Sequence, residues 1–185
     1  MKQLLSVGTV LIFAAVCARL VPHPPNVTPV IAMALVGGIY MDWRTGLIVP
    51  LAALFLSDII LGFHGLMLYV YGSVILTILL GRLVQRKKNY LTLTGASLCS
   101  SILFFVVTNA GVWFQGGGRF YPMTIDGLLM SYTFALPFFR NAILGDLFYV
   151  GLLVGLFEFA RRHGYLPDHS PREIVPSTRK VVEER

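Results

Sequence analysis

The chain is divided into apolar stretches that are long enough to cross a lipid bilayer. They cover residues 4–21, 30–41, 45–63, 66–84, 91–113 and 137–160. A spanning helix needs about 20 mostly apolar residues, because its backbone polar groups must be satisfied within the segment. Five stretches meet this need and the second is short. The pattern predicts an all-α integral membrane protein, a bundle of six transmembrane helices.

The composition leaves little sequence for a second, soluble fold. Of the 185 residues, 56% are hydrophobic and only 13% are charged. We therefore expect one membrane domain over residues 1–163 and a flexible cytoplasmic tail over 164–185. The formal charge of +6 could suggest nucleic acid. The basic residues lie beside membrane segments or in the tail, where anionic headgroups attract them, so we expect a lipid bilayer partner and no nucleic acid.

The lysines and arginines fall unevenly on the two sides of a six-span topology. One side carries Lys2, Arg44, Arg82, Arg86, Lys87, Lys88, Arg161, Arg162, Arg172, Arg179, Lys180 and Arg185. The other side carries only Arg19, Arg119 and Arg140. Cytoplasmic loops are enriched in Lys and Arg. This asymmetry predicts that both termini are cytoplasmic.

The connection over residues 22–29 carries four prolines in eight residues, which favours a stiff, extended outer loop. The apolar stretch after it would be about 18 Å long as a helix, short of a hydrocarbon core of about 30 Å. Either that helix continues past Trp43, or it sits deep while the proline loop dips into the membrane. We favour the dipping loop, because such a loop could line a pocket.

A second irregular region precedes the last apolar stretch. Residues 124–134 are half polar, with Asp126 at a suitable N-cap position and Pro137 beyond them. This pattern predicts a short interfacial helix before the last span, closed by Pro137.

Ionisable residues inside lipid are costly and usually functional. Asp58 and Arg140 fall at similar outer depths, so they could form a charge pair that clamps two helices, or one of them could bind a polar ligand group. Asp146 lies about 9 Å deeper than Arg140 along the same helix, so we expect it near mid-membrane and facing inward. Glu158 is expected to pair with Arg161 or Arg162 at the interface.

Asn109 and Trp113 lie four residues apart and share one helix face. They could be an interhelical hydrogen bonder and an interface anchor, or they could form the wall of an outward-facing site below His23, Asn26 and His64. Ala14 and Ala18 form a small-xxx-small pair, which permits either internal packing or docking of another helix.

The signatures of common enzymes are missing from the sequence. It contains no His-Glu-x-x-His, no Gly-x-Ser-x-Gly, no phosphate-binding Gly-x-x-x-x-Gly-Lys-Ser/Thr and no cysteine pair at metal spacing. We therefore expect neither an enzyme nor a resident cofactor or metal.

Four segments carry a likeness to known transport proteins: 22–29 (PHPPNVTP), 57–64 (SDIILGFH), 108–113 (TNAGVW) and 136–141 (LPFFRN). With six spans and cytoplasmic termini, the chain resembles the substrate-binding S components of energy-coupling factor (ECF) vitamin transporters. More narrowly, most of residues 5–160 resembles an uncharacterised bacterial family described as transport proteins, which implies a protein of the bacterial inner membrane.

The resemblance implies a ligand site near the outer face, capped by the loop after the first helix. The residues expected to bind ligand are His23, Asn26, Asp58, His64, Asn109, Trp113, Arg140 and Asn141. Ala14 and Ala18 would dock a membrane coupling subunit, and separate ATPases would supply energy. One solitary relative of this class handles cobalamin through a cysteine ligand to cobalt, and neither Cys17 nor Cys99 aligns with that cysteine.

The leading hypothesis is a substrate-binding subunit for uptake of a small vitamin-like or cofactor-like molecule, with cobalamin as one candidate. It would be energised by coupling subunits or would act alone. The alternative is a structural membrane protein of cell-shape or envelope assembly. A membrane hydrolase would need Asp58 or Asp146 paired with a base.

Overall fold

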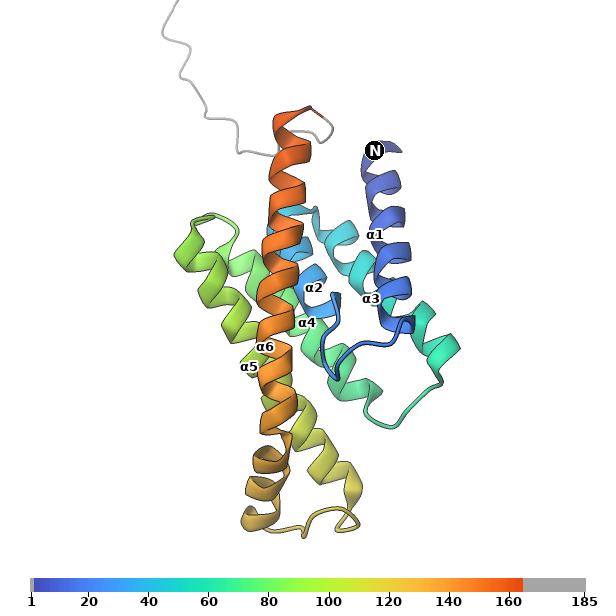
Figure 1. The fold of residues 1–185 in the computed structure, drawn as a ribbon, viewed down its shortest axis with the longest axis vertical. Coiled ribbons are helices and arrows are strands. Elements are labelled where there is room, and N and C mark those ends of the chain that lie inside the picture. The colour runs from blue at the N-terminus through green and yellow to red at the C-terminus, as the bar shows by residue number, and fades with distance from the viewer. Residues whose placement is uncertain (1, 165–185) are drawn as a thin grey trace, which may run out of the picture.

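The structure is a computed structural model that describes residues 2–164, a segment that contains six helices and no strand (Figure 1). The tail predicted after residue 164 lies outside the described residues. The helices are α1 (Lys2–Leu20), α2 (Val30–Tyr40), α3 (Trp43–Leu61), α4 (Met67–Val84), α5 (Tyr90–Gly116) and α6 (Ile125–Arg162).

The helices run alternately up and down between two ends of the molecule. The start of α1 and the end of α6 lie at one end, which we call the terminal end (Figure 1). The α2–α3 and α4–α5 connections also lie there, and the other three connections lie towards the opposite, distal end (Figure 1). Successive helices therefore alternate in direction along the chain, and the six membrane passes stay a prediction.

Four helices, α3 to α6, are long and apolar enough to cross a membrane. The described part of α1, Thr9–Leu20, and α2 are shorter apolar helices. Large apolar side chains such as Phe55, Leu68 and Phe148 are exposed on the outside of the bundle. Serines, a threonine and two aspartates are buried inside it. This distribution is typical of a protein whose outer surface meets lipid, so the predicted all-α membrane class is confirmed.

Helix α2 forms the centre of the bundle. Every residue from Val30 to Ile39 is buried, and the helix packs against α3, α4, α5 and α6. It ends at Tyr40, and the Asp42 side chain then caps α3 by accepting hydrogen bonds from the N–H groups of Arg44 and Thr45. The first interpretation of this short stretch, a helix that continues past Trp43, is therefore wrong. The second interpretation, a proline loop that dips inward, stays a prediction.

Glycines allow α2 to touch its neighbours backbone to backbone. A Cβ atom on Gly38 would lie 2.3 Å from the Ile78 carbonyl oxygen of α4, and one on Gly81 would lie 2.4 Å from the Leu35 oxygen of α2. Such distances are far inside van der Waals contact, so only glycine fits at either position. Small residues allow this approach where lipid gives helices no hydrophobic reason to associate.

Helix α6 differs from its prediction. It is one helix of 38 residues that contains Pro137, so this proline does not close a separate interfacial helix. Its N-cap is Thr124, whose hydroxyl accepts a hydrogen bond from the Gly127 N–H, and Asp126 lies in the first turn instead. At 1.5 Å per residue the helix is about 57 Å long, much longer than a hydrocarbon core of about 30 Å. Together with α5 it extends beyond the other helices at the distal end (Figure 1).

Candidate functional site

A cavity of about 420 Å³ lies inside the distal half of the bundle. We call it the distal cavity. Its walls come from α1, the proline loop, the α3–α4 connection and all of the helices from α2 to α6. A smaller cavity of about 220 Å³ adjoins it, because the two share Asn26, Val70, Phe104 and Ala142. Polar and aromatic side chains from distant parts of the sequence therefore meet around one partly open space.

The proline loop forms part of this wall, through His23, Asn26 and Thr28. The end of the loop packs on α6, since a Cβ atom on Gly145, near the middle of that helix, would be only 3.2 Å from the Val27 Cα atom, whereas residues 22–26 are exposed. Asn26 adopts a left-handed backbone conformation with φ of 64°, which asparagine tolerates better than most residues. Residues 27–29 thus join the loop to the bundle, and the predicted dip of the loop into the membrane stays a prediction.

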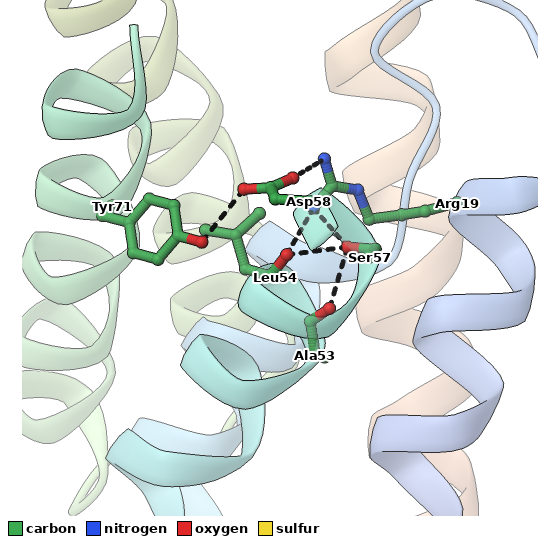
Figure 2. Close-up of polar contacts among 6 residues, drawn as sticks. All are labelled: Arg19, Ala53, Leu54, Ser57, Asp58 and Tyr71. Atoms are coloured by element: carbon green, nitrogen blue, oxygen red, sulfur yellow. Dashed lines mark hydrogen bonds and ion pairs between the residues drawn. The ribbon is translucent and has the colours of Figure 1, made fainter. Parts of the chain in front are cut away.

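A buried ion pair borders the distal cavity and joins α1 to α3. The Nη2 nitrogen of Arg19 lies 2.9 Å from Oδ1 of Asp58, close enough for an ion pair although not aligned as a hydrogen bond (Figure 2). The Asp58 side chain is 1% exposed, and its Oδ2 atom accepts a hydrogen bond of 3.0 Å from the Tyr71 hydroxyl of α4. The pair holds three helices at one point.

Arg19 has further partners on α3. Its Nη1 atom donates to the Ser57 hydroxyl oxygen at 2.7 Å and to the Leu54 carbonyl oxygen at 3.3 Å (Figure 2). The sequence considered Arg140 as the partner of Asp58, and this prediction is wrong, because the cation that pairs with Asp58 is Arg19. Arg140 is exposed on α6. Arg19 replaces it because the end of α1 packs against α3 at the depth of Asp58.

Asp146 is a second buried carboxyl group, on the wall of the distal cavity. It is 4% exposed, and its Oδ2 atom accepts a hydrogen bond of 2.7 Å from the Ser101 hydroxyl of α5. No ion pair involves Asp146 among the described residues. The expectation of an inward-facing Asp146 is confirmed.

The predicted ligand residues divide into two groups. His23, Asn26 and His64 line the distal cavity, Asn26 and Asn109 line the smaller one, and Asp58 contacts the cavity-lining Arg19. Trp113, Arg140 and Asn141 line neither of these two cavities.

Asn109 and Trp113 use their polar groups locally. The Asn109 side-chain amide donates to the Phe105 carbonyl oxygen of its own helix at 2.8 Å, so it is not the interhelical donor that one interpretation expected. The Trp113 Nε1–H donates to the Pro122 carbonyl oxygen at 2.9 Å, which ties α5 to the connection that leads into α6.

Three residues on or beside the cavity were not assigned to a site from the sequence: Arg19, Thr28 and Ser101. Arg19 gave a usable signal, because it is a lone cation at the outer end of an apolar stretch. Thr28 and Ser101 gave none, since neither a threonine in a loop nor a serine in an apolar helix has a pattern that marks it as part of a cavity wall.

A second, larger hollow of about 1360 Å³ opens at the terminal end. It is lined by several basic residues, among them Arg82, Arg86 and Arg162. Glu158 on its wall forms an ion pair of 2.6 Å with Arg161, as predicted, and accepts a hydrogen bond from the Tyr40 hydroxyl at 3.0 Å. The Tyr40–Glu158 hydrogen bond joins the ends of α2 and α6 at the side expected to face the cytoplasm.

The small residues of α1 point in different directions. Ala15 is buried in the bundle core, Ala18 is half-buried and Ala14 is exposed. Helix α1 packs mainly on α3. Its outer face at Ala14 is therefore not covered by the described part of this chain.

Comparison with known proteins places the chain in a family but assigns it no activity. A long-helix bundle with polar groups buried inside and apolar ones outside defines an integral membrane protein. The chain belongs to a family of unknown function, DUF6580, which it matches over residues 1–169. No curated protein and no solved structure matches it.

Proposed function

We propose that this protein is a substrate-binding membrane subunit that captures a small vitamin-like or cofactor-like molecule. The observation that carries the proposal is the distal cavity, a space of about 420 Å³ with the exposed His23, Asn26 and His64 and the buried Asp146 on its wall. Ligand sites are mostly apolar cavities of a few hundred Å³ with a few placed polar groups. The wall of this cavity fits that description.

The direction of capture follows from the charges. Arg44, Arg82, Arg161 and Arg162 lie at the terminal end, as the positive-inside rule requires of a cytoplasmic face. The distal cavity then opens towards the outside of a bacterial inner membrane, beneath the proline loop. The loop would act as its cover.

The energy for uptake would come from separate coupling and ATPase subunits, or the chain would act alone. The exposed Ala14, one turn before Ala18 on α1, is the surface on which a coupling subunit would dock, because small residues permit close helix approach.

Ligand-dependent stabilisation tests this proposal. A ligand that binds only the folded state raises the melting temperature. Purified protein in detergent would be heated with each member of a panel of vitamins and cofactors, cobalamin included. We expect at least one to raise Tm, and His64→Ala, on the cavity wall, to weaken that effect. His163→Ala, the same substitution at the terminal end, is the matched control. No rise with any panel member would contradict the proposal.

An alternative is a structural membrane protein of cell-shape or envelope assembly, and one observation favours it. The α5–α6 hairpin extends past the other helices, and Phe114, Phe120 and Phe134 on it are each more than 60% exposed. Exposed aromatic groups outside lipid are typical of protein interfaces. A deletion strain separates the two functions. If Phe114→Ser and Phe120→Ser abolish complementation while His64→Ala retains it, the structural function is favoured.

A further inference from the structure

Two carboxyl groups are buried among the described residues, Asp58 and Asp146, and only the first has a cation beside it. Asp58 has the Arg19 guanidinium at 2.9 Å. Asp146 has only the Ser101 hydroxyl, which engages its Oδ2 atom at 2.7 Å. The Ser101 contact fixes the direction of the carboxyl group and leaves Oδ1 for another partner. Since both groups are almost fully buried, Asp146 is the one whose charge has no counterpart in the described part of the chain.

The rest of the distal cavity does not supply that counterpart. Its other titratable wall groups are Arg19, His23 and His64. Arg19 is committed to Asp58 and Ser57. His23 and His64 are exposed, and neither forms an ion pair with Asp146 in the described part of the chain. The wall contributed by α2 consists of Val30 and Ile31, and α5 contributes Phe104.

A carboxylate without a cation is costly to bury, and the cost falls when a positive group enters beside it. Asp146 faces a cavity of ligand size, so the cation can come from a ligand. Resting on the function proposed above, we propose that the captured molecule carries a positively charged amine or ammonium group, which binds the Asp146 carboxylate inside the distal cavity. Aromatic surface at Phe104 would accept the organic part of the same ligand.

The test compares ligands that differ in charge but hardly in shape. Pyridoxamine, pyridoxine and 4-pyridoxate share one ring and carry an amine, a hydroxyl or a carboxylate at one position. Choline and 3,3-dimethylbutan-1-ol form a second pair, a cation and its uncharged isostere. These probes would be added to the vitamin and cofactor panel, and Tm and Kd measured on the full chain in detergent at neutral pH.

We expect the panel members that raise Tm to be cations. Asp146→Asn keeps the shape of the side chain and removes its charge, so it should weaken their binding about tenfold or more, the effect of losing a charged hydrogen bond. Ser101→Ala is the matched control. It removes the hydrogen bond that Ser101 donates to Asp146 but leaves the carboxylate, so the preference for cations should remain.

The outcomes separate this inference from the function on which it rests. If neutral or anionic members bind as well as cations, or bind Asp146→Asn as well as the wild type, the cationic class is wrong and the binding function stands. If no member raises Tm, the binding function itself fails. If Asp146→Asn does not fold, the comparison of charged and uncharged probes on the wild-type chain still decides the question.

Discussion

Arg19 and Asp58 show how two single residues can fix the arrangement of three helices. Neither charge could be buried alone without a large loss of hydration energy. Together, with Tyr71 and Ser57 as further partners, they satisfy one another inside the bundle. Breaking such a buried pair from one side typically costs about 3–5 kcal/mol, because it leaves an uncompensated charge.

We therefore expect Arg19→Met, which keeps much of the apolar stem, to lower the free energy of unfolding by roughly this amount, about 3 kcal/mol or more. Arg140→Met is the matched control, since Arg140 is exposed and its loss should stay within about 0.5 kcal/mol. Denaturant unfolding of both variants in detergent measures the difference. Equal effects of the two substitutions would show that the pair contributes nothing. The double variant Arg19→Met/Asp58→Asn should recover part of the loss.

Asp42 gives a prediction for pH. Hydrogen bonds from the Thr45 side chain and from the backbone N–H groups of Thr45 and Arg44 lower the pKa of Asp42 and outweigh the opposing effect of partial burial. Because the folded-state pKa lies below the unfolded value, the stabilisation is fully present above the unfolded pKa of about 3.9 and is lost as the pH falls through the folded value.

Asp42→Asn should remove the Asp42 contribution to this acid-side loss while keeping a capped α3, and Asp42→Ala should cost about 0.5–2 kcal/mol at neutral pH. Unfolding measured between pH 7 and pH 3 checks both. An Asp42→Asn variant with an unchanged pH profile would contradict the assignment.

Among single residues, the sequence identified the charged groups that are energetically costly to bury better than it identified their partners. Asp58, Asp146 and Glu158 stood out because charges in apolar helices are rare, and each has a polar role in the structure. Partner choice depends on helix rotation and packing, which hydropathy does not contain. For that reason Asp58 was matched with Arg140 in place of Arg19.

The contact between α2 and α4 depends on glycine at two positions. Gly38→Ala and Gly81→Ala would each place a methyl group against a backbone carbonyl oxygen of the facing helix. Backbone yields less easily than a side chain, so we expect a loss of about 1–3 kcal/mol, the usual cost of overpacking.

Gly72→Ala is the control for this element, because it lies on the same helix, α4, with no atom within 4 Å of its added Cβ. It should be neutral or stabilising by about 0.5–1 kcal/mol, since alanine favours a helix. Thermal unfolding of the three variants side by side measures the order. A Gly81→Ala variant as stable as Gly72→Ala would mean that α2 and α4 lie further apart than described.

Helix positions and types were well predicted from apolar length, and helix ends less well. The break between α2 and α3 at Met41 and Asp42 follows from a capping aspartate and a short apolar run. The continuity of α6 through Pro137 did not follow, because neighbouring helices can stabilise a proline that would end a solvent-exposed helix. The glycine contacts were missed, since glycine gives no sign of which face it lies on.

At the scale of the whole molecule, the distribution of lysines and arginines predicts the orientation of the protein in the membrane. With the terminal end in the cytoplasm, a cysteine placed at Gly118 in the α5–α6 connection should react with a membrane-impermeant maleimide in intact cells. A cysteine placed at Lys87, between α4 and α5, should react only after the membrane has been permeabilised. The background chain would carry Cys17→Ser and Cys99→Ser, as both cysteines are free thiols. If Lys87→Cys is labelled in intact cells and Gly118→Cys is not, the orientation is the opposite of the predicted one.

The enclosed position of α2 has a consequence for how the chain is assembled. With 11 residues it is about 16 Å long, roughly half of a 30 Å hydrocarbon core, so it would be a poor occupant of lipid on its own. Its surroundings are provided by helices synthesised after it, mainly α3, α4 and α6. During biosynthesis α2 can therefore reach its final position only after the later helices have been made. A chain truncated before α6 should leave α2 accessible to protease.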